Sequence, residues 1–251
     1  MKKLLTILLS VLMVLSLAGC AKKEEAPGEE QPQAEEKLVP DPVTAKNNYA
    51  DFVAAANDTE LEILMSVQDH QAYWEDNGQG KCTVYGQDDD GGYFVYEMKC
   101  DKALADVLLP GTLIKVTGYK SEWSGELELM DATAEFCDVG GNAGKVYDPK
   151  DVTDKVGTDD LINFMNQKVA IKGLEVTNLS KKDSEYDPDL YISVKLNGAE
   201  FDLCVENYLT DPSTEVYKTA EGLKVGDVID ITGYLYWYNG PNPHVTAITV
   251  K

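Results

Sequence analysis

The sequence contains no arginine. All 22 of its basic residues are lysine, set against 44 acidic residues, and the formal net charge is −22. Arginine provides the planar fork of donors that proteins favour for phosphates and base edges, and a large negative charge repels a polyanion within the screening length. We therefore expect nucleic acid to be an unlikely partner.

Histidine is scarce as well, and no catalytic motif joins His70 or His244 to an acid and a nucleophile. Because no catalytic constellation is present, we expect a protein that is not an enzyme, with a hydrolase as a minor alternative. The cysteines beyond residue 20 form no CxxC pair, so a zinc site has little support. Neither a metal ion nor another cofactor is expected.

The N-terminus has the order of an export signal. Lys2 and Lys3 precede a largely apolar run over 4–17, and Leu17-Ala18-Gly19-Cys20 gives the small-residue-then-cysteine pattern of lipoprotein processing. A membrane-spanning helix is the competing interpretation, but it needs about 20 apolar residues, and this run stops at Cys20 before a strongly polar stretch. We expect residues 1–19 to be a signal peptide and the chain to lie at the extracytoplasmic face of the cell membrane.

Residues 20–43 form an acidic segment rich in glutamate and proline. It has almost nothing to bury, so it cannot offset the entropy lost on ordering, and we expect an extended tether. The N-terminal pattern resembles that of bacterial lipoproteins, which implies that Cys20 becomes the first residue of the mature chain and carries lipid. Two or more acyl chains then anchor the protein to the membrane where a single chain would bind only transiently.

The rest of the chain contains an internal repeat. The run LLPGTLIKVTGY over 108–119 matches LKVGDVIDITGY over 223–234, and the same offset of 115 residues relates Gly111 to Gly226 and Gly118 to Gly233. Two copies of one domain are the simplest account. We expect a first domain over 44–140, a linker over 141–157 and a second domain over 158–251.

Both copies show the same order of predicted elements. A helix-like segment (48–57 or 158–166) is followed by three strand-like runs, a short helix (102–108 or 215–223) and two more strands around an aromatic loop. The three runs cover 61–67, 81–86 and 93–99 in the first copy, and 168–176, 190–196 and 200–206 in the second. Five short strands with a helix between the third and fourth are typical of the OB fold, a small Greek-key barrel. The sequence therefore predicts a mainly β protein with two tandem five-stranded OB-fold-like barrels.

Three blocks add a family resemblance: GGYFVYEMKC at 91–100, GYKSEWSGE at 118–126 and LYWYNGPNPH at 235–244. With these blocks, about 200 residues resemble uncharacterised bacterial lipoproteins with tandem OB-type domains, in the wider neighbourhood of the anticodon-binding-like OB superfamily. The resemblance implies the fold and the lipid anchor, and it brings no activity with it. One departure is that OB domains that bind nucleic acid have basic grooves, whereas this chain is acidic.

The candidate ligand-binding residues lie in predicted loops. OB folds usually bind through the face of strands two and three and through the loops that join strands one to two and four to five. Aromatic rings beside amide and imidazole groups suit a sugar or peptide surface. The alternative is that the aromatic side chains fill the barrels or pack between the domains. The candidates are Trp74, Trp123, Trp237, Tyr238, Asn242 and His244.

Cys82 and Cys100 are a candidate disulfide. If a hairpin turns around Asp90-Gly91-Gly92, the two residues lie opposite each other on one face of adjacent strands. A cross-strand disulfide and two buried thiols both remain open at this point.

For function, we expect a membrane-anchored, extracytoplasmic, non-enzymatic binding module with a protein or glycan partner. The first alternative is an OB-type nucleic-acid-binding or nuclease-accessory protein, which is a common use of the fold but needs a basic surface. The second alternative is a hydrolase.

Overall fold

The computed structural model describes residues 43–137, 144–182 and 188–251. The predicted signal peptide, the lipidated Cys20 and nearly all of the predicted tether lie outside these residues. Within the described residues, no helix is long and apolar enough to cross a membrane.

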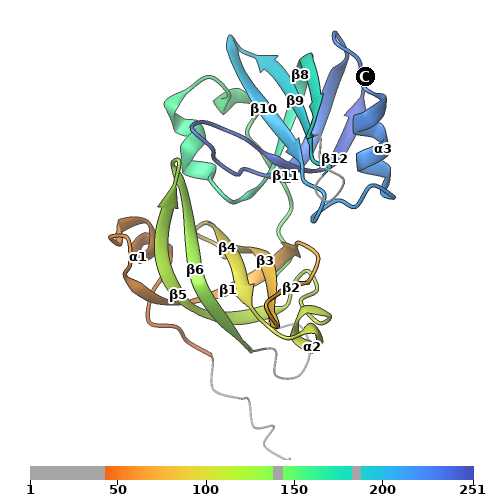
Figure 1. The fold of residues 1–251 in the computed structure, drawn as a ribbon. Helices are drawn as coiled ribbons and strands as arrows, with labels where there is room; N and C mark the ends of the chain where they lie inside the picture. The colour runs from red at the N-terminus through yellow and green to blue at the C-terminus, as the bar shows by residue number, and fades with distance from the viewer. Residues whose placement is uncertain (1–42, 138–143, 183–187) are drawn as a thin grey trace, which may run out of the picture. The chain divides into compact units, whose positions relative to one another are not determined.

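The first sheet closes into a barrel with OB topology (Figure 1). Its strands follow the order β1-β5-β6-β4-β3, and β1 also pairs with β3, which closes the ring. The β4–β6 pair is parallel, as the Greek-key connection of this fold requires, whereas the other pairs in the ring are antiparallel. The five strands are β1 (Glu60–His70), β3 (Gln79–Gln87), β4 (Gly92–Lys99), β5 (Leu113–Trp123) and β6 (Glu126–Phe136).

The second sheet repeats this topology. Its order is β11-β12-β10-β9-β8, the β11–β8 pair closes the ring, and β10 and β12 pair in parallel. The strands are β8 (Lys168–Lys181), β9 (Leu190–Leu196), β10 (Ala199–Val205), β11 (Val228–Tyr234) and β12 (His244–Val250). The predicted tandem OB-like architecture is therefore confirmed.

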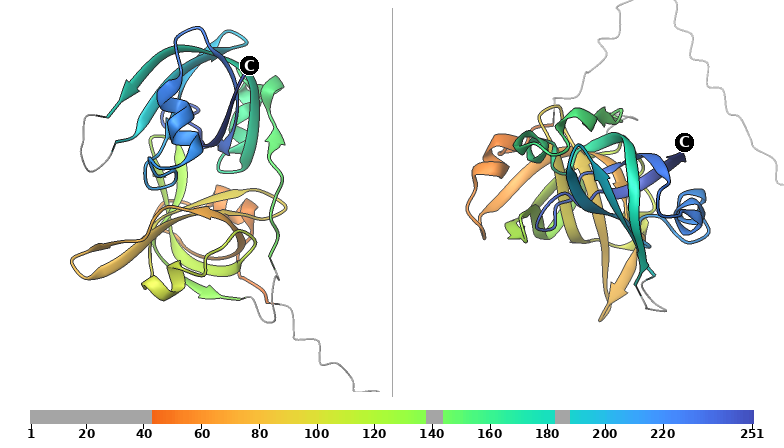
Figure 2. Two further views of the ribbon diagram at one scale, coloured as in Figure 1. Left: turned by 90° about the vertical axis from the view of Figure 1, so that its right-hand side faces the viewer. Right: turned by 90° about the horizontal axis from the view of Figure 1, so that it is seen from above.

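Each sheet has one strand more than the five predicted. In the first sheet, β2 (Trp74–Asp76) pairs with the start of β3, and Figure 2 shows this hairpin projecting beyond the barrel. In the second sheet, β7 (Lys150–Asp151) pairs in parallel with β8. Both extra strands lie at the edge of their sheet and contain only two or three residues.

The repeated glycines occupy equivalent positions in the two barrels. Gly111 and Gly226 have φ values of +89° and +94°, and their N–H groups donate to Val67 and Val176, which are equivalent positions on β1 and β8. Glycine adopts this left-handed backbone without steric cost, so both copies use it at the turn that enters the fourth strand. The strand register also shifts at the second glycine of each copy, next to Gly118 in β5 and at Gly233 in β11.

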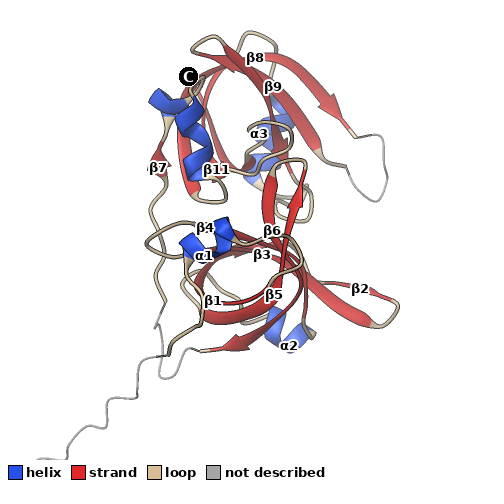
Figure 3. Cartoon of the chain, turned by 90° about the vertical axis from the view of Figure 1, so that its left-hand side faces the viewer, coloured by secondary structure: helices blue, strands red, loops and turns tan. Residues whose placement is uncertain are grey.

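Short helices complete the two barrels. Figure 3 shows α1 (Tyr49–Ala54) and α2 (Lys102–Ala105) at opposite ends of the first barrel, and α3 (Glu215–Gly222) takes the place of α2 in the second. Asn48 begins α1 with a capping box, because its side chain accepts from Asp51 N–H while the Asp51 carboxylate accepts from Asn48 N–H. The predicted helix over 158–166 is a 3₁₀ helix, η2 (Asp159–Phe164), and a shorter one, η1 (Thr153–Lys155), precedes it.

Each barrel has its own apolar core. Alternate residues of the first set of strands point inward around Phe52 of α1. The second core includes Tyr217 of α3, together with Val152 and Val156 from the segment between the two repeats. A third, smaller cluster joins the two barrels and is described below.

The predicted pairing of Cys82 with Cys100 is wrong by two residues. Cys82 lies opposite Met98, and Cys100 N–H instead donates to the Gly80 carbonyl. The turn is closed between Asp88 and Gly91, earlier than predicted, so that Gln87 pairs with Gly92, three residues from the predicted register. A bulge between Cys82 and Val84 then recovers one residue of this offset. Both cysteines are free, buried thiols.

Candidate binding cleft

A cleft of about 970 Å³ is lined by residues of both barrels. In the first barrel the lining comes from β3 and β4, from the β5–β6 hairpin and from Gln71 and Trp74, which follow β1. In the second barrel it comes from β9, β10 and the loop between β11 and β12. These are the strand face and the loops that OB folds generally use for ligands. Large aromatic side chains remain partly exposed there: Tyr96, Trp123, Tyr208 and Tyr238 are 37%, 61%, 40% and 54% exposed.

Five of the six predicted candidates line this cleft: Trp74, Trp123, Tyr238, Asn242 and His244. Trp237 does not, because its ring packs against the core of the second barrel and beside Gly125. Its backbone N–H donates to Glu126 Oε2 at 2.7 Å, which links the β11–β12 loop to the β5–β6 hairpin. The Asn242 side chain donates to the Asp202 carbonyl at 3.0 Å.

Beneath the cleft lies the aromatic cluster that joins the barrels. It consists of Tyr85 and Phe94 from the first barrel and Tyr234 from the second, all buried, with Tyr236 packed against them. The Tyr85 and Tyr234 rings stack at 4.5 Å, and Phe94 meets Tyr236 edge to face at 5.1 Å. The cleft wall therefore rests on rings from both repeats.

His244 connects this cluster to the cleft. Its Nδ1 atom lies 2.6 Å from the Tyr85 hydroxyl, which also accepts a longer hydrogen bond from the Gln71 side-chain amide at 3.4 Å. Since the Tyr85 oxygen already accepts from Gln71, its own proton is directed to Nδ1, and His244 is then the neutral tautomer protonated at Nε2. Burial lowers the pKa of His244 to about 3, so the ring is uncharged at neutral pH. The ring also stacks on Tyr236 at 4.4 Å.

Carboxylates form much of the remaining lining, which includes Glu97, Glu128 and Asp202. Glu128 is only 5% exposed, and burial raises its pKa although Ser121 donates a hydrogen bond to it. Lys182 is the only lysine among the described lining residues. The cleft therefore combines aromatic surface with a negative potential.

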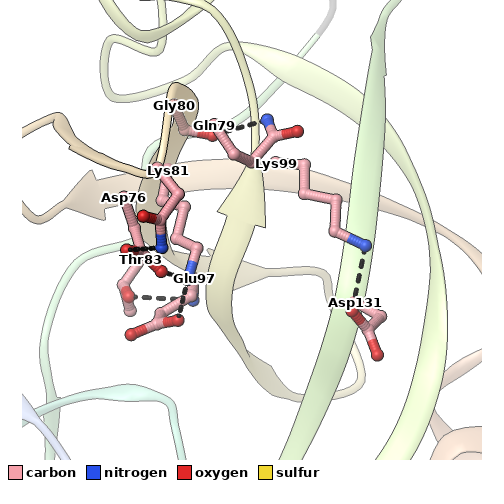
Figure 4. A network of polar contacts seen from close by, with 9 residues as sticks. Asp76, Gln79, Gly80, Lys81, Thr83, Glu97, Lys99 and Asp131 are labelled. Atoms are coloured by element: carbon pink, nitrogen blue, oxygen red, sulfur yellow. Dashed lines mark hydrogen bonds and ion pairs between the residues drawn. The ribbon is translucent and has the colours of Figure 1, made fainter.

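An ion-pair network borders the cleft at Glu97 (Figure 4). Lys81 Nζ lies 2.7 Å from the Glu97 carboxylate and 3.5 Å from that of Asp76, and Glu97 N–H donates to Thr83 Oγ1. The hydrogen bond with Glu97 raises the pKa of Lys81. This network fixes Glu97, which has a left-handed backbone with φ of 46°, at the cleft margin.

Sequence reasoning missed several lining residues on strands, notably Phe94, Tyr96 and Glu128. A signal for the first two was present, because residues two apart on a strand share a face and Phe94 and Tyr96 alternate within YFVYE. Their rings stack at 6.2 Å. Glu128 carried no such signal, since its burial depends on the fold bringing β4 and β6 together.

The cysteine pair lies behind one wall of the cleft. The Cys82 thiol donates to the Gln71 carbonyl at 3.3 Å and lies 3.4 Å from His70 Nδ1. The adjacent Cys100 thiol, together with burial, raises the pKa of Cys82, and the same contact lowers the pKa of Cys100. Among the described residues, no group of three or more His, Cys, Asp or Glu side chains is placed to hold a metal ion.

Comparisons with known proteins give structural likeness alone. No family model and no curated protein matches the chain. A solved structure of a murine DNA-binding protein bound to double-stranded DNA is 12% identical, with a TM-score of 0.36 over 76% of this chain and 94% of that one. An Ifi202 HINa domain in complex with double-stranded DNA is 13% identical, with a TM-score of 0.34 over 78% and 96% of the two chains. A replication protein A heterotrimer bound to single-stranded DNA is 12% identical, with a TM-score of 0.35 over 78% and 49%.

All three structures contain DNA, which contradicts two predictions made from the sequence. The expected protein or glycan partner, and the expectation that nucleic acid is an unlikely one, are both wrong by this comparison. The charge argument considered only the phosphates, whereas bases bind to OB folds largely by stacking on aromatic rings, which net charge does not prevent. The identities and TM-scores are too low to transfer a ligand to this chain.

Proposed function

We propose that this protein binds single-stranded nucleic acid by stacking unpaired bases on the aromatic side chains of the cleft. The observation that carries the proposal is the partial exposure of large rings from both barrels, above all Trp123 and Tyr238, in one cleft of about 970 Å³. Stacking of a base on an aromatic ring contributes about 1–3 kcal/mol and tolerates any sequence. The uncharged Nε2–H of His244 adds one donor for the edge of a base.

The acidic lining determines how such binding would work. Phosphates are repelled by Glu97, Glu128 and Asp202, so the backbone lies outside the cleft while the bases enter it. Few phosphates are then neutralised and few counterions released, so added salt weakens binding very little. This behaviour differs from the steep salt dependence of basic OB proteins.

The test is a fluorescence titration of the folded protein with single-stranded DNA oligonucleotides at low and moderate salt. We expect quenching of tryptophan emission, and we expect Trp123→Ala and Tyr238→Ala each to weaken binding by about 5- to 150-fold, the equivalent of one lost stacking contact. Affinity should change less than tenfold between the two salt concentrations.

Phe136→Ala is the matched control, because Phe136 is 49% exposed but does not line the cleft. It should leave affinity unchanged. Absence of binding by the native chain, or equal losses for Phe136→Ala and Trp123→Ala, would refute the proposal.

A second candidate ligand is a small organic cation. It is favoured by the excess of carboxylates over lysine in the lining, together with rings that attract cations over their faces. A titration with an aromatic amine separates the two candidates, since such a ligand would lose affinity in Glu128→Gln, whereas a stacked oligonucleotide would not.

We also propose that the chain is a lipoprotein, attached through Cys20 to the extracytoplasmic face of a membrane, with folded domains over 44–140 and 158–251. The N-terminal pattern of lysines, apolar residues and Leu17-Ala18-Gly19-Cys20 supports the anchor. The sequence repeat supports the domain limits.

A further inference from the structure

Glu126 is a buried carboxyl group at the contact between the two barrels. It is the first residue of β6, directly after the turn of the β5–β6 hairpin, and its side chain is 0% exposed. Its Oε2 atom accepts from Trp237 N–H at 2.7 Å, whereas its Oε1 atom has no hydrogen-bond partner among the described residues. A buried oxygen without a partner is costly, and a buried charge more so.

Asn166 is the second buried residue with an unpaired atom. It follows η2 in the second barrel and is 2% exposed, and its side chain lies against the Glu126 carboxyl. Its Nδ2 group donates to the Leu127 carbonyl at 3.0 Å, whereas its Oδ1 atom has no partner among the described residues. If the amide nitrogen and oxygen of Asn166 were exchanged, Oδ1 would face the Leu127 carbonyl oxygen, and two acceptors would repel each other. The orientation of the Asn166 amide is therefore fixed.

The two unpaired atoms are both acceptors, Glu126 Oε1 and Asn166 Oδ1. A proton on the carboxyl removes its buried charge, which lowers the cost of leaving Oε1 without a partner. We propose that Glu126 is a neutral carboxylic acid in the folded protein, and that in this form it accepts from Trp237 N–H and so fixes the β5–β6 hairpin to the second barrel.

The groups around Glu126 agree with this state. Burial raises the pKa of Glu126 well above 4.5, and the charge of Glu128 raises it further, whereas Asn166, Trp237 N–H and Lys120 lower it by less. Lys120 acts only through space, and burial lowers its own pKa. The remaining titratable groups that face the carboxyl are the hydroxyls of Tyr49 and Tyr236, both with raised pKa values.

The hairpin that Glu126 fixes also forms the cleft. Trp123 is the last residue of β5, directly before the turn, and the Ser124 carbonyl accepts from Asn239 N–H at 2.7 Å, next to Tyr238. Glu126 is therefore a positioning residue for two exposed rings of the cleft. The inference does not depend on which ligand binds there.

Stability should fall as pH rises if Glu126 is protonated in the fold. A carboxyl whose pKa is higher in the folded than in the unfolded chain contributes stability below 4.5, and this contribution is lost as pH rises toward the folded value. Glu126→Gln keeps an acceptor for Trp237 N–H but does not titrate. The unfolding equilibrium constant of the native chain should rise relative to that of the variant by up to about tenfold per pH unit from pH 4.5 upward.

Urea unfolding of both chains from pH 4 to pH 8 tests this expectation, with Glu122→Gln as the matched control because Glu122 is exposed on the same hairpin. The control should follow the native profile. If Glu126 were charged in the fold, Glu126→Gln would instead lose stability relative to the native chain as pH rises, which would overturn the proposal.

Infrared spectroscopy provides a second measurement that needs only folded protein. The native chain at neutral pH should show the carbonyl band of a protonated carboxylic acid, and the difference spectrum against Glu126→Gln should isolate it. A difference spectrum with only carboxylate bands would contradict the proposal even if the variant had unchanged stability.

Discussion

His244 shows how a single ring couples the cleft to the core. Its Nδ1 atom is paired with Tyr85 and its ring is stacked on Tyr236, so protonation would place a second proton between two donors in a buried site. Burial lowers the pKa of the ring to about 3, against an ordinary value of 6.5. The ring is part of the folded structure only in its neutral form.

We predict that this histidine makes the protein less stable in acid. A group whose folded pKa is lowered contributes stability above 6.5 and loses it as pH falls toward 3, here by up to about 1.4 kcal/mol per pH unit. His244→Gln retains an acceptor for the Tyr85 hydroxyl but does not titrate. Its free energy of unfolding, measured in urea at pH 7 and pH 4.5, should change less than that of the native chain. Equal changes would show that His244 is protonated in the fold.

Single residues were only partly predictable from the sequence. Trp123, Tyr238 and His244 were found because aromatic residues next to glycine and proline in an OB loop favour a ligand-binding interpretation. Trp237 was grouped with them but does not line the cleft, because its ring packs against the core of the second barrel. The burial of Glu126 carried no local signal, since the residues that cover it come from the other repeat.

At the scale of elements, the fourth strand of each barrel depends on its internal glycine. A Cβ atom at Gly233 would overlap the His244 carbonyl oxygen on the neighbouring β12, and one at Gly118 would press against Ala132 on β6. The backbones approach closely at these points because the register shifts there and the barrel bends.

We predict that Gly233→Ala lowers the free energy of unfolding by about 1–3 kcal/mol, because backbone atoms cannot give way as a flexible side chain would. Gly222→Ala is the control in the same barrel, since a Cβ atom there meets nothing within 4 Å and alanine favours the helix by roughly 0.5–1 kcal/mol. Thermal unfolding measures both. If both substitutions destabilised the protein equally, the loss in Gly233→Ala could not be due to the contact of the new Cβ atom with the His244 backbone.

Elements were more predictable than their pairing. The repeat and the period of two residues located the ten barrel strands, because each strand has one face toward a core. Strands β2 and β7 were missed, as they are too short to show a period and exist only through their partners. The cysteine register was wrong because the hairpin turn closes between Asp88 and Gly91, earlier than the turn around Asp90-Gly91-Gly92 that the sequence suggested.

At the scale of the whole molecule, the net charge bears on the proposed lipid anchor. A chain with a net charge of −22 is repelled by anionic head groups, so attachment to a membrane would depend on lipid rather than on the protein surface.

We therefore predict that Cys20→Ser in the full chain abolishes acylation and leaves the N-terminal segment uncleaved. The substitution removes the sulfur atom that would carry the lipid through a thioether bond. Mass spectrometry of the N-terminal peptide measures both effects, and Cys137→Ser is the control. An acylated, processed Cys20→Ser chain would refute the lipoprotein proposal.

The aromatic cluster beneath the cleft has a consequence for how the protein unfolds. Tyr85 and Phe94 are covered by Tyr234, so melting either barrel uncovers large rings of the other. Exposing those rings to water costs free energy, and this cost couples the unfolding of the two barrels. When one barrel unfolds, the other loses part of the surface that buries its aromatic rings. A chain that arose as two copies of one barrel would thereby denature as a single cooperative unit.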